Sequence, residues 1–499
     1  MPNEELYYLP ASELLKYIQA EKERLIKEKV VKKSKPLPPI TEEEKPYELP
    51  EDWEWTRLSD ICSKITDGEH IKPKSVELGI PLLTAKNIRE TEIIIDNVDY
   101  ISLEDAEKSW NRCNPEFNDI LICSRGTVGR NTLVTLTRRF CLMGNVILVK
   151  PFDAYVKSKY INYYLKTNFA QNTMAGMSGS TAVNALYLKD VNYLIIPVPP
   201  LYIQDQIVQQ LEQLYETKDS LLSHAESQLN YTKKMREVLL QEAIRGELVP
   251  QDEDDEPASV LLEKIKTEKE RLIKEKVIKK QKELPPITED EKPYDLPSGW
   301  EWVRLGEISQ TLNYGYTASA TDIDTGVKML RITDIQDNKV NWETVPFCEI
   351  DPEKLSSYIL HPNDIVIART GTVGKSFIIK DISCTSVFAS YLIRVQLLEN
   401  INATYVKKFI ESPLYWDQLV DKTTGTGQPN VNATSLSQLI LPLPPLAEQE
   451  RIVAKLDELM ANCDQLEAKA EEMKNYTMKL FEASLKEAFM PLNNNDEED

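Results

Sequence analysis

Residues 11–61 read ASELLKYIQAEKERLIKEKVVKKSKPLPPITEEEKPYELPEDWEWTRLSDI, and residues 258–308 read ASVLLEKIKTEKERLIKEKVIKKQKELPPITEDEKPYDLPSGWEWVRLGEI. At a constant offset of 247, 36 of these 51 positions are identical. A match of this length, which contains LPxxWEWxRL twice, indicates an internal duplication rather than low complexity. The chain therefore contains two copies of one unit, each about half its length.

The repeat continues beyond this stretch at an offset of 245 residues. DILICSRGTVGR at 119–130 matches DIVIARTGTVGK at 364–375, and IPVPPLYIQDQIVQQLEQL at 196–214 matches LPLPPLAEQERIVAKLDEL at 441–459. The stretches between these matches, 62–118 and 309–363, share little sequence. Similar ends with different interiors indicate a common frame that carries two different recognition surfaces.

Each copy is expected to fold as a mixed α/β unit. Strand-like runs such as DILIC, NVILVKP, EIIIDNV, DIVIA and YLIRVQL alternate with turns and with helical pieces such as KSKYINYYLKT. We predict two α/β units in tandem, separated by long antiparallel coiled-coil helices, with a pseudo-twofold internal repeat. The expected segments are a helical linker at 1–48, a globular unit at 49–200, a long helix at 201–247, an acidic and helical linker at 248–295, a second globular unit at 296–445, a second long helix at 446–490 and a disordered acidic tail at 491–499.

The two long segments that begin after a Pro-Pro pair have the spacing of a coiled coil. Apolar residues recur in them at steps of three and four, without an interior Gly or Pro. The predicted seam residues are Ile207, Leu211, Leu214, Leu221, Ala225, Met235 and Leu239 in the first, and Ile452, Leu456, Leu459, Leu466, Ala470, Met473 and Leu480 in the second. An amphipathic helix lying on its own domain is the alternative, but about 45 residues at 1.5 Å each reach about 67 Å, beyond one domain's surface. Two such helices would most simply pair antiparallel and hold the globular units at a fixed separation.

The charge is unevenly distributed along the chain. The formal net charge of −21, taken as a whole, argues against a nucleic-acid partner. The interiors are nearly neutral, however, because 62–200 holds 16 Lys/Arg against 14 Asp/Glu and 309–445 holds 11 against 14. The acidic excess therefore lies in the helices, linkers and tail, and the globular units can still approach phosphates.

The composition, 41% hydrophobic and 28% charged, is typical of a folded protein. No run of about 18 apolar residues occurs, so no membrane span is expected, and MPNEELYYLP lacks the features of a signal peptide. The seven cysteines form no CxxC pair, which favours a reducing, cytoplasmic location over a disulfide framework. The three histidines lie far apart, so no metal site is expected.

No catalytic motif is evident. TGTVGKSF at 370–377 resembles a phosphate-binding loop, but that motif requires Gly five positions before the Gly-Lys pair, and Arg369 stands there. We interpret this stretch and its counterpart RGTVGRN as a turn after a strand. No GxGxxG after a strand, GxSxG, HExxH or amino-methyltransferase motif occurs. The sequence thus predicts a chain that binds and positions, while other subunits carry out the chemistry.

LPEDWEWTRLSDI, ITDGEH, SRGTVGR, the Pro-Pro entry to a heptad helix and LLQEAIRGELVPQ together resemble the DNA-specificity subunits of type I restriction-modification systems. The second copy repeats this order with LPSGWEWVRLGEI, NYGYTAS, RTGTVGK, PLPPLAEQERIV and LKEAF. The resemblance covers essentially the whole chain, and the duplication is itself part of the family's pattern. One departure, YIQDQ at 202–206 where the second copy has AEQER, concerns only the start of the first long helix.

The resemblance implies that 49–200 and 296–445 are target recognition domains, each of which binds one half of a bipartite double-stranded DNA site. It also implies that the helices set the gap between half-sites and dock two DNA-methyltransferase subunits, which two restriction/translocase subunits join. S-adenosylmethionine, ATP and Mg²⁺ would belong to those partners, and no cofactor is expected on this chain. We expect weak DNA binding by the isolated chain and tight binding by the complex.

Long polar side chains on loops are the expected sequence readers, because Arg, Lys, Asn and Gln read the major groove. The candidates are Lys72, Lys74, Lys86, Asn87, Arg89, Arg125, Ser178, Ser180 and Asn184 in the first unit, and Tyr314, Tyr316, Arg331, Arg369, Lys375, Gln428 and Asn430 in the second. Each has a structural alternative, since the arginines of the turns could pin those turns and the two tyrosines could be core residues. Four tryptophans that start the units, at 53, 55, 300 and 302, are expected to pack in the frame.

Two other functions are weighed against this one. The chain could serve a methyltransferase fused to its own nuclease, without a translocating motor, which the neighbouring genes would decide. A coiled-coil scaffold with no DNA role is disfavoured, because a scaffold has no evident reason to vary both globular surfaces while keeping both frames.

Overall fold

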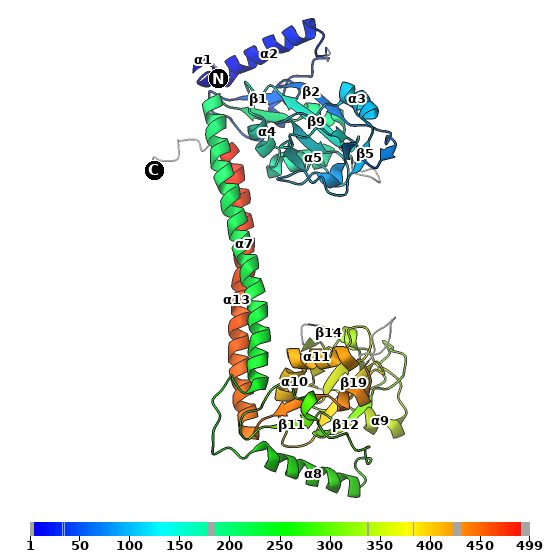
Figure 1. Ribbon diagram of the computed structural model, residues 1–499. Coiled ribbons are helices and arrows are strands. Elements are labelled where there is room, and N and C mark those ends of the chain that lie inside the picture. Colours follow the sequence, from blue (N-terminus) through cyan, green and yellow to red (C-terminus); the bar gives the residue numbers. More distant parts are fainter. Residues whose placement is uncertain are drawn as a thin grey trace. The chain divides into compact units, whose positions relative to one another are not determined.

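The structure is a computed structural model that describes residues 4–31, 33, 35–177, 185–336, 339–382, 384–422 and 431–490. The chain divides into two compact units. Unit 1 comprises Met1–Ala225 and Glu472–Asp499, and unit 2 comprises Glu226–Glu471. Two long helices, α7 (Leu201–Arg245) and α13 (Leu446–Phe489), contribute residues to both units (Figure 1).

Unit 1 combines short helices with small β-sheets. Ahead of α7 its helices are α1 (Glu4–Tyr7), α2 (Ala11–Lys27), α3 (Leu103–Arg112), α4 (Ser158–Tyr164), α5 (Asn168–Met177) and α6 (Leu188–Tyr193). Its strands are β1 (Glu54–Arg57), β2 (Cys62–Asp67), β3 (Ser75–Val76), β4 (Ile80–Leu83), β5 (Asp99–Ile101), β6 (Ile120–Cys123), β7 (Asn131–Leu133), β8 (Cys141–Leu142), β9 (Val146–Pro151) and β10 (Ile195–Val198).

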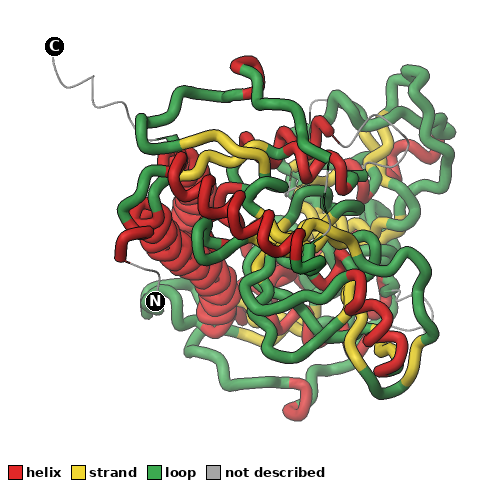
Figure 2. Tube along the Cα trace, turned by 90° about the horizontal axis from the view of Figure 1, so that it is seen from above, coloured by secondary structure: helices red, strands yellow, loops and turns green. Residues whose placement is uncertain are grey.

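Unit 2 has a similar set of elements. Its helices ahead of α13 are α8 (Ala258–Lys274), α9 (Pro352–Tyr358), α10 (Ala403–Glu411), α11 (Pro413–Lys422) and α12 (Ala433–Ser437). Its strands are β11 (Glu301–Arg304), β12 (Ser309–Tyr314), β13 (Lys328–Leu330), β14 (Ile335–Gln336), β15 (Lys339–Val340), β16 (Ile365–Ala368), β17 (Ser376–Ile378), β18 (Ser386–Phe388), β19 (Leu392–Leu397) and β20 (Ile440–Leu443). Helices and strands thus mix in both units, which confirms the expected α/β class (Figure 2).

The central sheet has the same strand order in both units. It runs β2-β9-β6-β7 in unit 1 and β12-β19-β16-β17 in unit 2, antiparallel throughout. Strands β6 and β16 are buried along their whole length, since both of their faces are covered. A second antiparallel pair, β1-β10 or β11-β20, joins the start of each globular part to its end. The frame that the repeat predicted is therefore this sheet and this strand pair.

The interiors of the two units differ, as the divergent sequences predicted. Unit 1 adds a sheet in the order β3-β5-β4-β8, whereas unit 2 has the pairs β13-β18 and β14-β15. The strand expected for EIIIDNV at 92–98 is wrong. Only Ile93 makes a bridge there, to Ile88, and the chain turns at Asn97, which has a φ of 53°. The next strand, β5, begins after that turn.

The repeated tryptophans pack in the frame. Trp53 and Trp300 are buried in the main cores of their units. The ring of Trp55 lies 5.1 Å from that of Tyr47, and Trp302 repeats this contact with Tyr294 at 5.1 Å.

A buried glutamine fixes the start of each long helix. Gln204 accepts a hydrogen bond from the Lys157 backbone N–H at 2.8 Å and donates to the Pro199 carbonyl at 2.9 Å. Gln449 does the same in unit 2, with the Asn402 N–H at 3.0 Å and the Pro444 carbonyl at 2.9 Å. Because both helices begin directly after the Pro-Pro pair and hold the same glutamine, the YIQDQ departure does not alter the helix start.

Helices α7 and α13 pack antiparallel, as predicted. In unit 1 the rings of Tyr215 and Phe481 lie 4.7 Å apart. In unit 2, Arg236 pairs with Asp464 at 2.5 Å and with Glu467 at 3.1 Å. Each helix ends in the core of the unit where the other begins, so α13 delivers Phe481, Leu485 and Phe489 to unit 1 and α7 delivers Leu240, Ala243 and Ile244 to unit 2.

The seam of the helix pair differs in part from its prediction. Ile207, Leu211, Ala225, Ile452, Leu456 and Ala470 are buried, and Leu214, Leu239, Leu459, Leu466 and Met473 are half-buried. Leu221, Met235 and Leu480 are exposed instead. Small residues occupy the buried heptad positions near them, because Thr232, Cys463 and Thr477 continue the seven-residue steps set by Leu211 and Leu456.

Within the described ranges, none of the helices combines the length and the apolar character that crossing a membrane requires. The same ranges contain no group of three or more His, Cys, Asp or Glu side chains arranged to hold a metal. All seven cysteines are free, and all but Cys384 are buried.

Candidate nucleic-acid interface

The RGTVG and TGTVG stretches form hairpin turns at the same edge of the two central sheets. Strand β6 pairs antiparallel with β7, and β16 pairs antiparallel with β17. Both turns contain two glycines with positive φ, at 79° and 85° in unit 1 and at 73° and 85° in unit 2. A strand that turns back into a strand is not the strand-loop-helix arrangement of a phosphate-binding loop. The interpretation of these stretches as turns is therefore confirmed.

A glycine follows the first central strand in each unit and brings two loops together. A Cβ on Gly68 would collide with the carbonyl oxygen of Leu142, and a Cβ on Gly315 would collide with that of Ala389. Only glycine permits so close a backbone approach. The last residues of β2 and β12, Asp67 and Tyr314, are thereby held beside the hairpin turn of their own unit.

In unit 1 these elements enclose a hollow of about 320 Å³. It is lined by side chains from β2, the hairpin turn and the start of α6, among them Asp67, His70, Ser124, Arg125, Tyr187 and Lys189. His70 Nε2 lies 3.2 Å from the Asp67 carboxylate and 3.0 Å from Arg112 Nη2. Arg112 also pairs with Asp67, so this buried carboxylate positions both the histidine and the arginine.

In unit 2 the same place holds a stacked pair. The guanidinium of Arg369 lies 4.6 Å from the centre of the Tyr314 ring, a cation–π arrangement. The Tyr314 hydroxyl accepts a hydrogen bond from the Ala433 backbone N–H at 3.1 Å. Both side chains are partly exposed, and the ring of Tyr314 holds the planar guanidinium in place.

Backbone hydrogen bonds establish that these positions correspond. Ser124 accepts a bond from the Leu186 N–H at 2.9 Å, and Arg369 accepts the equivalent bond from the Val431 N–H at 3.2 Å. Asp67 and Tyr314 each end the first strand of their central sheet, opposite an isoleucine of the next strand. Aspartate and serine in unit 1 therefore stand where tyrosine and arginine stand in unit 2.

The other candidates in unit 1 have varied surroundings. Lys74, Lys86, Arg89 and Arg125 are exposed. Lys72 is exposed but pairs with Asp99 at 2.7 Å, and this bond lowers the pKa of that carboxyl. Asn87 is buried, and its amide bonds the Thr84 N–H at 2.9 Å and the Ile94 carbonyl at 3.1 Å. This amide is therefore engaged in the fold and does not face solvent.

The candidates of unit 2 also divide. Lys375 is exposed on the hairpin turn. Arg331 makes an ion pair with Asp334 at 2.7 Å, and this hydrogen bond raises the pKa of the guanidinium. Tyr316 packs against the Tyr358 ring at 5.3 Å. Ser178, Ser180, Asn184, Gln428 and Asn430 lie outside the described residues, as does the 491–499 tail.

Sequence reasoning missed the centre of the unit 1 hollow. Asp67 and His70 line the hollow but are not long basic side chains, and Arg112, which pairs with Asp67 from outside the lining, lies 45 residues away in sequence. The signal was present in the repeat, however. Aligning ITDGEH with NYGYTAS sets Asp67 opposite Tyr314, and such a change within a matched frame marks a variable position.

A second exposed feature lies on the long helices. The sequence NYT occurs at 230–232 and again at 475–477, 245 residues later. In each copy the threonine is buried, while the tyrosine is largely exposed, 71% for Tyr231 and 67% for Tyr476. Four residues further on, Met235 and Leu480 are also exposed. We call each pair, Tyr231 with Met235 and Tyr476 with Leu480, a helix patch; one lies in each unit.

The comparisons with known proteins agree on one family. The type I restriction modification DNA specificity domain matches residues 50–231 and 297–474. The specificity subunit of the Escherichia coli type I restriction enzyme EcoAI is 32% identical, covering 93% of this chain and 86% of that protein. The Escherichia coli EcoEI specificity subunit is 28% identical, covering 97% and 89%.

Solved structures share the fold. A chain from a study of complex assembly and conformational transition of a type I restriction-modification system superposes with a TM-score of 0.60 at 18% identity, covering 89% of this chain and 99% of that one. The HsdS subunit from Thermoanaerobacter tengcongensis superposes with a TM-score of 0.55 at 19% identity, covering 89% and 98%.

Proposed function

The chain belongs to the family of type I restriction-modification DNA specificity subunits, and on that premise we propose that each unit reads one half of a bipartite DNA target. A specificity subunit recognises DNA and is not itself catalytic. Its two recognition domains stand in tandem, and we propose 49–200 and 296–445 as their bounds.

One observation carries this proposal. Two equivalent positions on one frame hold Asp67 and Ser124 in unit 1 but Tyr314 and Arg369 in unit 2. The buried aspartate orients the histidine and arginine side chains around it, whereas an arginine donates hydrogen bonds, most often to guanine. Different chemistry at matched places is what two different half-sites require. We propose that Arg125 and Arg369 contact base edges, that the buried Asp67 orients His70 and Arg112 beside its half-site, and that Lys72, Lys74, Lys86, Arg89 and Lys375 contact phosphates.

The antiparallel helices α7 and α13 are proposed to set the gap between the half-sites. We further propose that the two helix patches dock two methyltransferase subunits. Exposed tyrosine and methionine or leucine side chains are of the types enriched at protein interfaces. Because the patches are equivalent under the internal repeat, two identical partners can each meet the same surface.

The reaction itself is proposed to belong to the partners. S-adenosylmethionine would serve the methyltransferase subunits, and ATP and Mg²⁺ would serve two restriction/translocase subunits that join them in the cytoplasm. A methyltransferase fused to its own nuclease is the alternative assembly, and no feature of this chain favours it.

The proposal is tested by methylation mapping. DNA from cells that express this chain with its methyltransferase subunit should show a split motif with a fixed gap and one modified base on each strand. A continuous motif would mean that one unit does not read DNA. Modification that does not depend on the chain would contradict the proposal altogether.

Docking is tested separately by co-purification. The double variants Tyr231→Ala with Met235→Ala, and Tyr476→Ala with Leu480→Ala, should each lose one methyltransferase subunit from the complex. Retention of both subunits by the quadruple variant would exclude the helix patches. The matched control is Glu237→Ala with Glu482→Ala, an exposed pair on the same helices.

A further inference from the structure

Two short segments carry a strong positive charge in an otherwise acidic chain. Residues 22–35 contain seven Lys/Arg against two Asp/Glu, and residues 269–282 contain the same numbers. Each segment includes the C-terminal part of a helix, α2 or α8, and the turn that follows it. We call these segments the basic arms. The reading positions described above do not include them.

Each arm is held firmly at its base. The inner face of α2 buries Ala11, Leu14 and Ile18, and that of α8 buries Ala258, Leu261 and Ile265. The amine of Lys22 donates to the Ser59 carbonyl at 2.5 Å, and Lys269 donates to the Gly306 carbonyl at 2.7 Å. Burial lowers the pKa of both amines. These two lysines therefore act as anchors.

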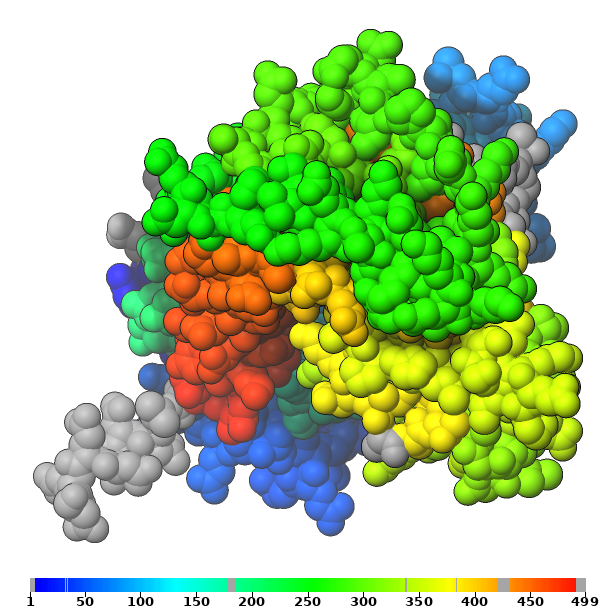
Figure 3. Space-filling view, turned by 90° about the horizontal axis from the view of Figure 1, so that it is seen from below, coloured from blue at the N-terminus to red at the C-terminus, as the bar shows by residue number. Residues whose placement is uncertain are grey.

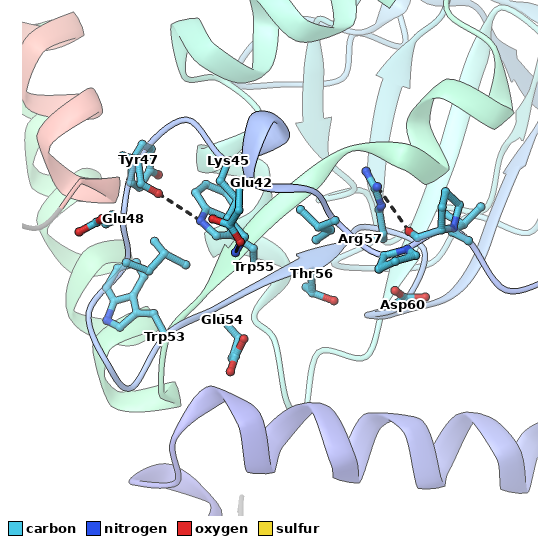
Figure 4. A pocket seen from close by; sticks show the side chains of 15 residues that line it. Glu42, Lys45, Tyr47, Glu48, Trp53, Glu54, Trp55, Thr56, Arg57 and Asp60 are labelled. Carbon is cyan, nitrogen blue, oxygen red and sulfur yellow. Dashed lines mark hydrogen bonds and ion pairs between the residues drawn. The ribbon is translucent and has the colours of Figure 1, made fainter.

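The far end of each arm is also attached. A Pro-rich strap returns from each arm to the first strand of its unit, and in unit 1 this strap and strand form the pocket of Figure 4. Arg57 bonds Glu44 at 2.7 Å, and its equivalent Arg304 bonds Glu291 at 2.9 Å. Arg304 also donates to the Pro285 carbonyl at 2.7 Å. The stretch between anchor and strap is thus tethered at both ends.

Between these attachments the arms present unpaired lysines. Arg24 and Arg271 are each neutralised by two glutamates, at 2.6 to 2.9 Å. The arms also hold exposed lysines that make no ion pair in the described part of the chain. These are Lys27, Lys29, Lys33, Lys35, Lys274, Lys276, Lys279, Lys280 and Lys282. Figure 3 shows the green α8 segment on the surface of unit 2.

Lysine stands at a position where glycine is favoured. Lys29 and Lys276 end their helices with a φ of 61°, in the left-handed region. Glycine is the usual residue at this point, and a side chain there costs about 1 kcal/mol. Both copies keep the lysine despite that cost. Stabilisation of the helix end by a cation is a contributing reason, but the lysines five to eight residues beyond the helices lie outside its range.

The arm of unit 1 lies beside the proposed reading surface. Lys189 of α6 lines the hollow of Asp67 and His70, and it also lines the groove between Lys22 and Lys35. A DNA backbone that extends from the hollow across α6 would therefore reach the arm. In unit 2, Gly306 fits between Leu284 of the strap and Ser437 of α12, so the arm again adjoins the helix next to the Arg369 position.

We propose that the basic arms, 22–35 and 269–282, bind the DNA phosphate backbone just outside the two half-sites. This inference rests on the proposed function and adds to it a sequence-independent contact. Lysines act as point charges without base-specific geometry, which suits phosphate contacts. Two matched arms would add an equal phosphate contact at each half-site and offset the chain's net charge.

The test compares three forms of the complex with its methyltransferase subunits. The arm variant replaces Lys276, Lys279, Lys280 and Lys282 by Gln. The matched control replaces four exposed lysines of the same unit, Lys264, Lys266, Lys354 and Lys380, by Gln. Binding is measured on a duplex that extends well beyond the mapped motif and on a duplex trimmed to the motif, over a range of salt concentrations.

We expect the arm variant to bind the long duplex about tenfold more weakly than wild type, with a salt slope reduced by about 2 to 3. The trimmed duplex should bind all three forms alike, and the methylated motif should not change. Equal affinities and slopes on the long duplex would overturn the proposal. So would a loss on both duplexes, or unchanged DNA binding with loss of a protein subunit. Failure of wild type to bind its motif would instead refute the proposed function.

Discussion

Units 1 and 2 share a frame but differ where that frame opens. Their central sheets have the same order, and the same glycine follows the first strand in both. At the opening, unit 1 has a carboxylate that orients a histidine and an arginine, whereas unit 2 has an arginine stacked on a tyrosine. The comparison teaches that duplication supplied two equal frames, and we propose that specificity resides in a few positions where these frames open.

Exchanging the divergent region of one unit should have the largest effect on recognition. Replacing residues 62–195 by the same region of a relative should alter one half of the methylated motif completely and leave the other half and the gap unchanged. The physical reason is that strand β1, all of β10 except its first residue, and helix α7 stay in place. Methylation mapping of the chimera is the measurement, and a change in both halves would break the modular account.

The frame itself should respond equally in the two units. Gly68→Ala and Gly315→Ala each force a Cβ against a backbone carbonyl, and overpacking of this kind costs about 1–3 kcal/mol of unfolding free energy. Chemical denaturation of the purified chain measures both. Gly126→Ala is a control for glycine loss without a clash, because an added Cβ there meets no atom within 4 Å, although its positive φ adds some strain. A clearly smaller effect at one of the two clashing positions would show that the frames are not equivalent.

The Arg369 side chain should discriminate bases in one half-site only. Arg369→Ala should reduce discrimination at one base pair by about 1–3 kcal/mol, because the fixed guanidinium fork is lost. Arg369→Lys keeps the charge but not the fork, so we expect most of the discrimination to be lost while overall affinity is kept. Competition binding with single-base variants of the target measures this. A uniform loss across all sequences would identify a phosphate contact instead.

The straps should give the smallest effect. The hydrogen bond from Arg57 lowers the pKa of Glu44, and the Thr288 backbone hydrogen bond, followed by Arg304, lowers that of Glu291. A carboxyl with a lowered folded pKa stabilises the fold above its unfolded pKa, and this stability is lost as pH falls through the folded pKa. Thermal unfolding should show the loss in acid, below about 1 kcal/mol per pair because both carboxylates are partly exposed. Glu44→Gln should remove the part of the pH dependence of stability that Glu44 contributes. An unchanged dependence would show that the Arg57–Glu44 pair does not contribute to it.

Much of the architecture could be predicted from the repeat and from periodicity. The two units, the turns at RGTVG and TGTVG, and the antiparallel long helices follow from patterns that the sequence shows directly. The buried residues between the two long helices could not all be predicted, because heptad spacing favours large apolar residues. Thr232 and Thr477 are buried instead, and Met235 and Leu480 are exposed. Helix partners decide which side of a helix is covered, and one helix's sequence does not contain that information.

The candidate site could be predicted less well. Asn87 has the residue type of a reader, yet its amide is used within the fold. Asp67 and His70 were not recognised, because the residues that surround them are set by the folded strands and cannot be identified from the local sequence. The position of Arg369 on the frame could be predicted because it lies in a matched motif, and its role as a base reader stays a prediction.

Methylation mapping of two single variants tests the central claim most directly. Cells would express the chain with Asp67→Ala or with Arg369→Ala, together with the methyltransferase subunit. The account predicts that each variant relaxes the motif within one half only, and that the two variants affect opposite halves. Relaxation of the same half by both variants, or an unchanged motif in both, would contradict it.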